Sequence, residues 1–213
     1  MNCNILMTIL AEYMSIFAHK SNNMNFEEYV AYFEAVLAEP EKHPLYSDPE
    51  YLNYTKLNWS RMNRWLKRFD VQEEVKQQIA AIAEPQQWLL ITEPWCGDAA
   101  HTVPQIVKMA ALNSNIQLDI QLRDAEPYLI SDYLTNGGKS IPKLIVRNVA
   151  GEDLFIWGPR PQSAQELFQQ MNAEQKTFEE LKEALQRWYN ADKGEELQKE
   201  FLAFFRSERK KVG

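Results

Sequence analysis

The sequence EPWCGDAAHTVP, residues 93–104, decides the fold of this chain. It follows WLLIT (88–92), a short apolar run typical of a buried strand, and it opens a helical stretch that we expect to run from about 95 to 112. Cys96 therefore lies where a strand ends and a helix begins, and the positive end of the helix dipole favours a thiolate and lowers the thiol pKa. Pro104 falls inside this helix, where it removes a backbone hydrogen bond and is expected to kink the axis.

Three more strands are predicted downstream. IQLDIQL (116–122) alternates apolar and polar residues, and KLIVRN (143–148) and DLFIW (153–157) are joined by a turn at Gly151 that is short enough for a hairpin. A further helix is expected near 127–134, between the second and third strands. The order strand-helix-strand-helix-strand-strand predicts an α/β fold with a central sheet covered by helices.

These features resemble the thioredoxin family. In that family a Trp-Cys-Gly-Pro-Cys motif follows the strand, and a kinking proline lies eight residues after the first cysteine, as Pro104 does after Cys96. The sequence SIPKLIV, with Ile141 and Pro142, is similar to the family's cis-proline loop, which faces the thiol. The resemblance covers about residues 86–175 and implies a thioredoxin-like sandwich, a central mixed sheet flanked by helices. The WCGD motif is similar to a bacterial branch of the family.

We divide the chain into four parts by helical periodicity and by this resemblance. The parts are a leader or short helix (1–23), a helical extension (24–85), the thioredoxin-like core (86–175) and C-terminal helices packed on the core (176–213). The leader differs from a signal peptide because no Lys or Arg precedes its apolar stretch and Glu12 interrupts it. Translation starts at Met1 or at Met24, and the sequence leaves both open.

Local signals place several helices in the two extensions. Ser47-Asp48-Pro49 is a helix start signal, and a third helix is expected at about 73–83. Capping-box spacing predicts two C-terminal helix starts, at Ser163 with Glu166 and at Thr177 with Glu180. The apolar face of the helix after Pro49 is predicted to hold Leu52, Trp59, Met62, Leu66 and Phe69.

The sequence departs from the thioredoxin pattern at three positions that take part in disulfide reduction and proton transfer. Ala99 stands in place of the second cysteine. Leu90 stands where the family has a buried Asp, and Ile120 where it has a buried Lys. Without a second thiol a mixed disulfide persists until an outside thiol arrives, so ordinary dithiol reductase activity is not expected.

Two functions follow from this site. The leading hypothesis is a single-cysteine redox protein, in which catalytic Cys96 cycles through sulfenic acid or a mixed disulfide with a protein or small-molecule thiol or disulfide. The alternative is a non-catalytic module that binds a peptide or protein in the same groove. Replacing Cys96 by Ser distinguishes the two, because only the enzyme loses activity. The expected pocket residues are Trp95, Gly97, Asp98, Ile141, Pro142 and Arg160.

Charged residues near Cys96 modify this expectation. Asp98 lies in the same first helical turn, where its carboxylate repels a thiolate and raises the thiol pKa. Asp98 and His101 are three residues apart and are expected to form a surface ion pair. The alternative is a Cys96, His101 and Asp98 set, which is less favoured because His101, five residues after Cys96, is poorly placed to face the thiol. Arg160 lies between Pro159 and Pro161 and is expected to be an exposed loop arginine; the alternative is that it steadies a thiolate or a substrate carboxylate.

No cofactor or metal is expected. The three histidines are too scattered for a metal site. An iron–sulfur cluster, which monothiol relatives of this fold can hold, is not favoured because CGDA lacks their usual aromatic-Ser ending. A peroxidase lacks support because Thr92 stands four residues before Cys96, where peroxiredoxins have three. Cys3 is a poor candidate for a distant resolving thiol because it lies in the leader.

Composition limits partners and compartment. The net charge of −7 argues against nucleic acid as a partner, and we interpret the basic cluster at 61–68 as a solvated helix face. The chain has only two cysteines and no run of eighteen apolar residues, so we expect a cytoplasmic protein without a membrane span. The sequence leaves the substrate, the reductant and the oligomeric state open.

Overall fold

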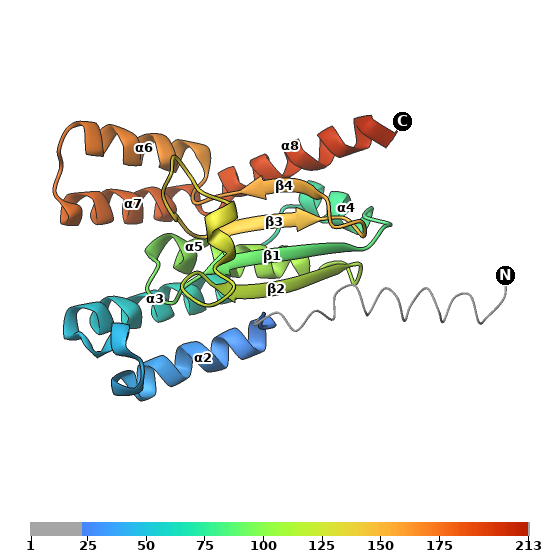
Figure 1. Cartoon of the computed structure of the whole chain (residues 1–213). Helices are drawn as coiled ribbons and strands as arrows, with labels where there is room; N and C mark the ends of the chain where they lie inside the picture. The colour runs from blue at the N-terminus through green and yellow to red at the C-terminus, as the bar shows by residue number, and fades with distance from the viewer. Residues whose placement is uncertain (1–22, 213) are drawn as a thin grey trace.

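The computed structural model describes residues 23–212 and places a four-stranded sheet at the centre, with helices around it (Figure 1). The strands are β1 (Gln86–Thr92), β2 (Ile116–Leu122), β3 (Lys143–Arg147) and β4 (Asp153–Trp157). Their order across the sheet is β2-β1-β3-β4. β1 pairs with β2 in parallel, and β3 is antiparallel to both β1 and β4. The predicted thioredoxin-like α/β fold, a mixed sheet flanked by helices with helical extensions, is confirmed.

The central strand β1 is buried on both faces, which explains its continuous apolar sequence. Leu90 pairs with Ile120 on one side and with Leu144 on the other, and all three side chains are fully buried. β1 leads through residues 93–96 into α5 (Gly97–Ala110), which also carries mostly buried side chains and contains Pro104. The carboxyl ends of β1 and β2 therefore lie at the edge of the sheet where α5 begins (Figure 1).

Within the described residues, three α-helices precede the sheet: α2 (Phe26–Ala38), α3 (Pro49–Arg68) and α4 (Glu73–Ala80). Two short 3-10 helices, η1 (Pro40–Lys42) and η2 (Pro44–Ser47), connect α2 to α3. The start of α3 is as predicted, because Asp48 is its N-cap and accepts a hydrogen bond from the amide of Tyr51. The predicted apolar face of α3 packs on the core: Met62 and Phe69 are buried, and Trp59 and Leu66 are half-buried against it. The prediction missed Trp65, which is buried against His101 of α5.

The helix expected near 127–134 is wrong. The chain forms only a short 3-10 turn there, η3 (Leu129–Asp132). Tyr128 adopts a left-handed backbone conformation, with φ 59°, which a right-handed helix cannot continue. The third helix, expected to reach residue 83, ends at Ala80.

Three helices follow the sheet: α6 (Gln162–Ala173), α7 (Phe178–Asp192) and α8 (Glu195–Val212). The capping box of Thr177 and Glu180 at the start of α7 is confirmed. The one predicted at Ser163 is wrong, because α6 starts at Gln162 and the amide of Ser163 donates to the Glu196 side chain. A tertiary partner has replaced the local cap.

The helices α6 and α7 form a hairpin beside the end of the sheet where α5 begins (Figure 1). They share a small apolar cluster of their own, separate from the main core. The cluster contains Ala164, Leu181, Leu185 and Tyr189. The hairpin thus lies beside residues 93–98, and its apolar side chains do not belong to the main hydrophobic core.

The predicted leader (1–23) and Cys3 lie outside the described residues, apart from Asn23. Among the described helices, none is both long and apolar enough to cross a membrane.

The helix α8 is anchored to the sheet by Phe201, which is fully buried and packs against Trp88, Phe155 and Trp157. We expect Phe201→Ala to lower the free energy of unfolding by about 4 kcal/mol, because it leaves a cavity in a close-packed core. Urea denaturation followed by circular dichroism measures this loss. Phe178→Ala is the matched control, since Phe178 is 70% exposed and should change stability by about 0.5 kcal/mol or less. Equal effects of the two variants would contradict the packing described for α8.

Candidate functional site

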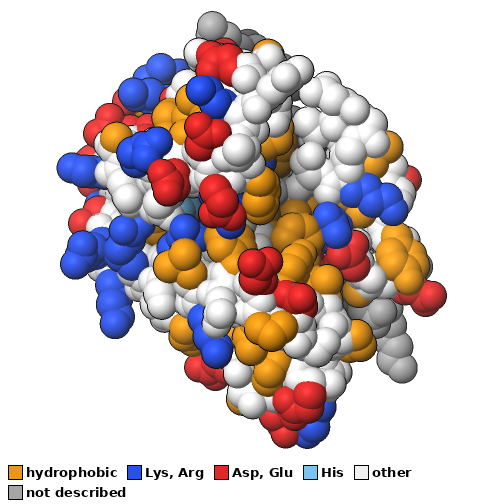
Figure 2. Space-filling view, turned by 90° about the vertical axis from the view of Figure 1, so that its left-hand side faces the viewer, with side chains coloured by type: hydrophobic (Ala, Val, Ile, Leu, Met, Phe, Trp, Pro, Cys, Tyr) orange, Lys and Arg blue, Asp and Glu red, His pale blue; other side chains and the backbone are white. Residues whose placement is uncertain are grey.

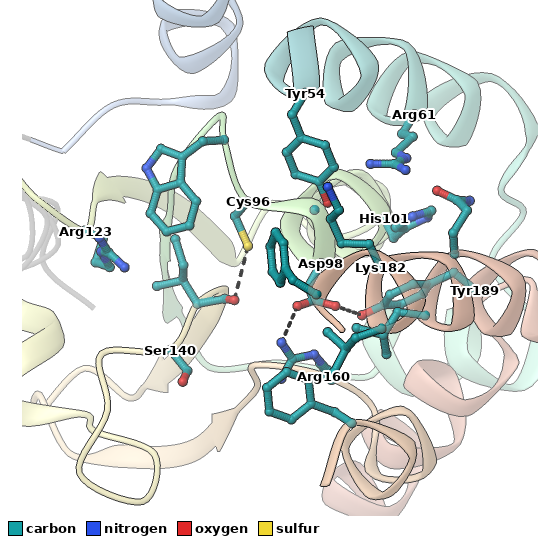
Figure 3. A pocket seen from close by; sticks show the side chains of 18 of the residues that line it. Tyr54, Arg61, Cys96, Asp98, His101, Arg123, Ser140, Arg160, Lys182 and Tyr189 are labelled. Atoms are coloured by element: carbon teal, nitrogen blue, oxygen red, sulfur yellow. Dashed lines mark hydrogen bonds and ion pairs between the residues drawn. The ribbon is translucent and has the colours of Figure 1, made fainter. Parts of the chain in front are cut away.

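Cys96 caps the N-terminus of α5 and contacts the loop before β3. Its Sγ accepts a hydrogen bond from the amide of Ala99 at 3.4 Å and donates one to the carbonyl of Ile141 at 3.3 Å (Figure 3). The peptide bond between Ile141 and Pro142 is cis. The two motifs singled out in the sequence, at 93–104 and at Ile141–Pro142, therefore meet at the sulfur atom.

The thiol of Cys96 is protonated at neutral pH. It is only 5% exposed, and burial, with the negative charge of Asp98 as the second cause, raises its pKa to about 12. The amide of Ala99 and the charge of Arg160 oppose this rise. Asp98 raises the thiol pKa, as predicted. The lowered pKa expected from the helix start is wrong for this protein, because burial outweighs the helix dipole.

Asp98 is the centre of a buried polar cluster. Its Oδ2 lies 2.8 Å from Nη2 of Arg160, and its Oδ1 accepts a hydrogen bond from the hydroxyl of Tyr189 at 2.9 Å (Figure 3). The side chains of Asp98 and Arg160 are 10% and 12% exposed, so the expected exposed loop arginine is wrong. A buried carboxylate needs a compensating cation, and Arg160 supplies it.

The expected surface ion pair between Asp98 and His101 is also wrong. His101 is buried, its ring stacks on that of Tyr189 at 4.2 Å, and its Nδ1 accepts a hydrogen bond from Nε1 of Trp65 at 2.8 Å. Burial, helped by the charges of Arg61 and Arg64, lowers the pKa of His101 to about 3. The imidazole is therefore neutral and cannot pair with a carboxylate.

A cavity of about 440 Å³ opens beside Cys96. Of the expected pocket residues, Trp95, Gly97, Asp98, Ile141 and Arg160 line it together with the thiol. Pro142 lies behind this wall, where its carbonyl faces Gly158. The backbone at Gly158 has φ +109°, and a side chain there would collide with that carbonyl.

Much of the cavity wall was missed by the sequence reasoning. The additional lining residues on α3 are Tyr54 and Arg61, and those on α7 are Phe178, Leu181, Lys182, Leu185, Gln186 and Tyr189. In Figure 3 both helices lie on the same side of the thiol, with Tyr54 and Arg61 above Tyr189. No local pattern marks them, because they come together only when α3 and the α6–α7 hairpin pack around α5.

Glu93 is a second buried carboxyl group that the sequence reasoning missed. It is 4% exposed, and its oxygens accept hydrogen bonds from the amide of Asp124 at 3.1 Å and the hydroxyl of Tyr46 at 3.5 Å. Burial raises its pKa to about 7. Glu93 thus titrates near neutral pH, three residues before the thiol.

Apolar side chains replace the second cysteine, the buried Asp and the buried Lys that the family uses in dithiol chemistry. Ala99, Leu90 and Ile120 are all buried at the positions where the resemblance places the second cysteine and its proton-handling partners. Within residues 23–212, His, Cys, Asp and Glu side chains form no group of three that could hold a metal ion.

Comparison with known proteins agrees with this architecture. A family model described as Thioredoxin matches residues 46–172. Among solved structures, the chain is similar to a protein of unknown function from Pseudomonas aeruginosa, with 17% identity over 71% of this chain and 85% of that one and a TM-score of 0.53. It is also similar to an HIV epitope-scaffold, with 16% identity over 75% and 87% of the two chains and a TM-score of 0.49. No curated protein matches the sequence significantly.

We expect Asp98→Asn to cost about 3 kcal/mol of stability, because it leaves the buried guanidinium of Arg160 without an opposite charge. It should also lower the pKa of Cys96, since the carboxylate is the second cause of its rise. Urea denaturation and the pH dependence of Cys96 alkylation measure the two effects. Asp124→Asn is the control, because it breaks the more exposed pair with Arg123 and should cost about 1 kcal/mol or less. An unchanged thiol pKa in Asp98→Asn would contradict the described electrostatics.

Glu93 should make stability depend on pH. Its folded pKa of about 7 lies above the ordinary value of 4.5, so its contribution is fully present below pH 4.5 and is lost as pH rises through 7. We expect Glu93→Gln to gain stability relative to the wild type as pH rises from about 5 to 8, by roughly 3 kcal/mol. Urea denaturation at several pH values measures this difference. The exposed Glu84→Gln control should show no such trend. A constant difference between wild type and Glu93→Gln would contradict the raised pKa.

Proposed function

The chain belongs to the thioredoxin family, and we propose that it is a binding module whose ligand enters the cavity beside Cys96 and is held there without thiol chemistry. The observation that carries this proposal is the state of the thiol. Cys96 is buried, and burial and Asp98 raise its pKa to about 12. A nucleophilic cysteine acts as a thiolate, and reactive cysteines are at least partly exposed. Cys96 instead serves as a neutral part of the cavity wall.

The cavity has the properties of a ligand site. Its volume of about 440 Å³ falls in the range that small-molecule pockets occupy. Aromatic and aliphatic side chains make up much of the wall, and a few polar groups converge on the same space. Such a combination buries an apolar ligand body while the polar groups fix its orientation.

Single-cysteine redox chemistry is the second candidate, and one contact favours it. The amide of Ala99 donates to Sγ, and this hydrogen bond would stabilise a thiolate more than a thiol. In that reaction the Cys96 thiolate attacks a ligand disulfide, the ligand S–S bond breaks and one half leaves as a thiolate. Because Ala99 replaces the second cysteine, an external thiol would have to release the other half and restore Cys96.

The pH dependence of iodoacetamide alkylation of Cys96 distinguishes the candidates. In a Cys3→Ser background, we expect slow alkylation with an apparent pKa above the free-cysteine value of about 8.5. Unfolding in urea should bring the pKa back to that value, which is the internal control. An apparent pKa well below 8.5 in the folded protein would overturn the binding module in favour of the redox candidate.

A screen of small-molecule fragments by amide NMR tests binding itself. Fragments should shift the resonances of cavity residues such as Trp95 and Tyr189, and Cys96→Ser should bind them within about twofold of the wild type. If no fragment shifts these resonances, the cavity is not a ligand site. If binding requires the sulfur, the thiol has a chemical role that a binding module lacks.

A further inference from the structure

The cavity concentrates positive charge in an acidic protein. Five Lys and Arg side chains line it, but Asp98 is its single acidic lining residue among the described residues. The whole chain carries a net charge of −7. His101 adds no charge, because burial lowers its pKa to about 3. The five cations are Arg61, Arg123, Lys139, Arg160 and Lys182. Basic side chains also gather along one flank of the molecular face in Figure 2.

Three of the five cations already have a carboxylate partner. Arg160 pairs with Asp98 at 2.8 Å, Arg123 with Asp124 at 2.7 Å and Lys182 with Glu179 at 2.6 Å. The last of these pairs is weak, because the Glu179 side chain is 75% exposed to solvent.

Arg61 differs from these three. Within residues 23–212 it forms no ion pair, and its Nη1 donates to the neutral side-chain oxygen of Asn58 at 2.9 Å. Its charge is therefore available to a ligand.

Arg61 and Lys182 both contact the ring of Tyr54 in the cavity wall. They come from α3 and α7, and both lie over the ring of Tyr54, at 5.3 and 4.9 Å from its centroid (Figure 3). Cation–π contacts of this kind orient the two cations before a ligand arrives. The two side chains form a preorganised positive pair, which we call the Arg61–Lys182 pair.

The same wall connects this pair to the loop that carries the thiol. Nδ2 of Asn58, whose oxygen holds Arg61, donates to the carbonyl of Pro94 at 3.1 Å. The hydroxyl of Tyr54 lies so close to Gly97 that any side chain at position 97 would collide with it. An anion bound by the Arg61–Lys182 pair would therefore lie next to the first turn of α5, near Cys96.

The rest of the cavity suits an apolar group. Trp95, Ile141, Phe168, Leu181 and Leu185 contribute apolar surface to it. We infer that the ligand is a small organic anion, an apolar body bearing a carboxylate or phosphoryl group, with the charged group on the Arg61–Lys182 pair. This inference rests on the proposed function, because it names the ligand class of the same cavity. Both anionic groups are recognised by the same charge-assisted hydrogen bonds.

Three probes of similar shape test the charge requirement: phenylacetate, phenylphosphonate and the neutral phenylacetamide. Titration followed by amide NMR shifts of cavity residues gives each affinity. We expect at least one of the two anions to bind tenfold or more tightly than the amide, because a charged hydrogen-bonded pair adds about that factor. The preferred anion identifies the carboxylate or phosphoryl source. Equal affinity for all three probes would overturn the anionic ligand.

Variants locate the charged group. Arg61→Gln and Lys182→Gln should each weaken binding of the preferred anion about tenfold and leave the amide unaffected, whereas Arg61→Lys should restore part of the affinity. Lys67→Gln is the matched control, because Lys67 lies exposed on the same helix outside the cavity. Thermal unfolding shows whether each variant folds. Unchanged anion binding in the folded Arg61→Gln and Lys182→Gln variants would overturn the assigned site.

The two proposals fail in different ways. If neutral fragments and the amide bind in the cavity but the anions have no advantage, the ligand class is wrong and the binding module stands. If neither the probes nor the fragments shift any cavity resonance, both the ligand class and the binding module are wrong.

Discussion

The buried carboxylate of Asp98 is the constraint on which the site depends. A charge in the protein interior is tolerated only with an opposite charge and hydrogen bonds. Arg160 comes from the segment between β4 and α6, and Tyr189 from the end of α7. By holding both, a single side chain at the start of α5 fixes the α6–α7 hairpin on the thioredoxin-like core. The hairpin has its own apolar cluster, and this polar contact, with the stacking of Tyr189 on His101, attaches that cluster beside the thiol.

The same carboxylate changes what the family's first cysteine can do. In a dithiol site the helix start stabilises a thiolate. Here burial is the largest cause that raises the pKa of Cys96, and the charge of Asp98, two residues later, adds to it. Arg160 opposes the rise but is itself paired with Asp98. Ala99 in place of the second cysteine and the protonated thiol of Cys96 are thus consistent with each other, because neither supports disulfide reduction. Both agree with the proposal that Cys96 is an unreactive part of the cavity wall.

The sequence predicted the elements whose signals are local. The strands agree within a residue or two because alternation and apolar runs reflect burial directly, and Asp48 and Thr177 cap helices that need no other partner. Predictions failed where a residue distant in the sequence determines the contacts of a side chain. Ser163 binds Glu196 instead of capping a helix, and His101 stacks on Tyr189 instead of pairing with Asp98. The thiol and the loop of Ile141 could be placed from sequence through the resemblance, whereas Tyr54, Arg61 and Lys182 carry no pattern that links them.

These three residues belong to the part of the cavity wall that α3 and α7 supply. The core supplies the thiol and the loop before β3, and α3 and α7 add a wall that combines aromatic rings with cations. Arg61 contacts a neutral amide and an aromatic ring, and within the described residues no carboxylate forms a direct ion pair with it. Desolvating such a charge costs free energy, and the proposed anion would recover part of that cost by pairing with it. In the proposed binding module, α3 and α7 would therefore act on the ligand through charge as well as through shape.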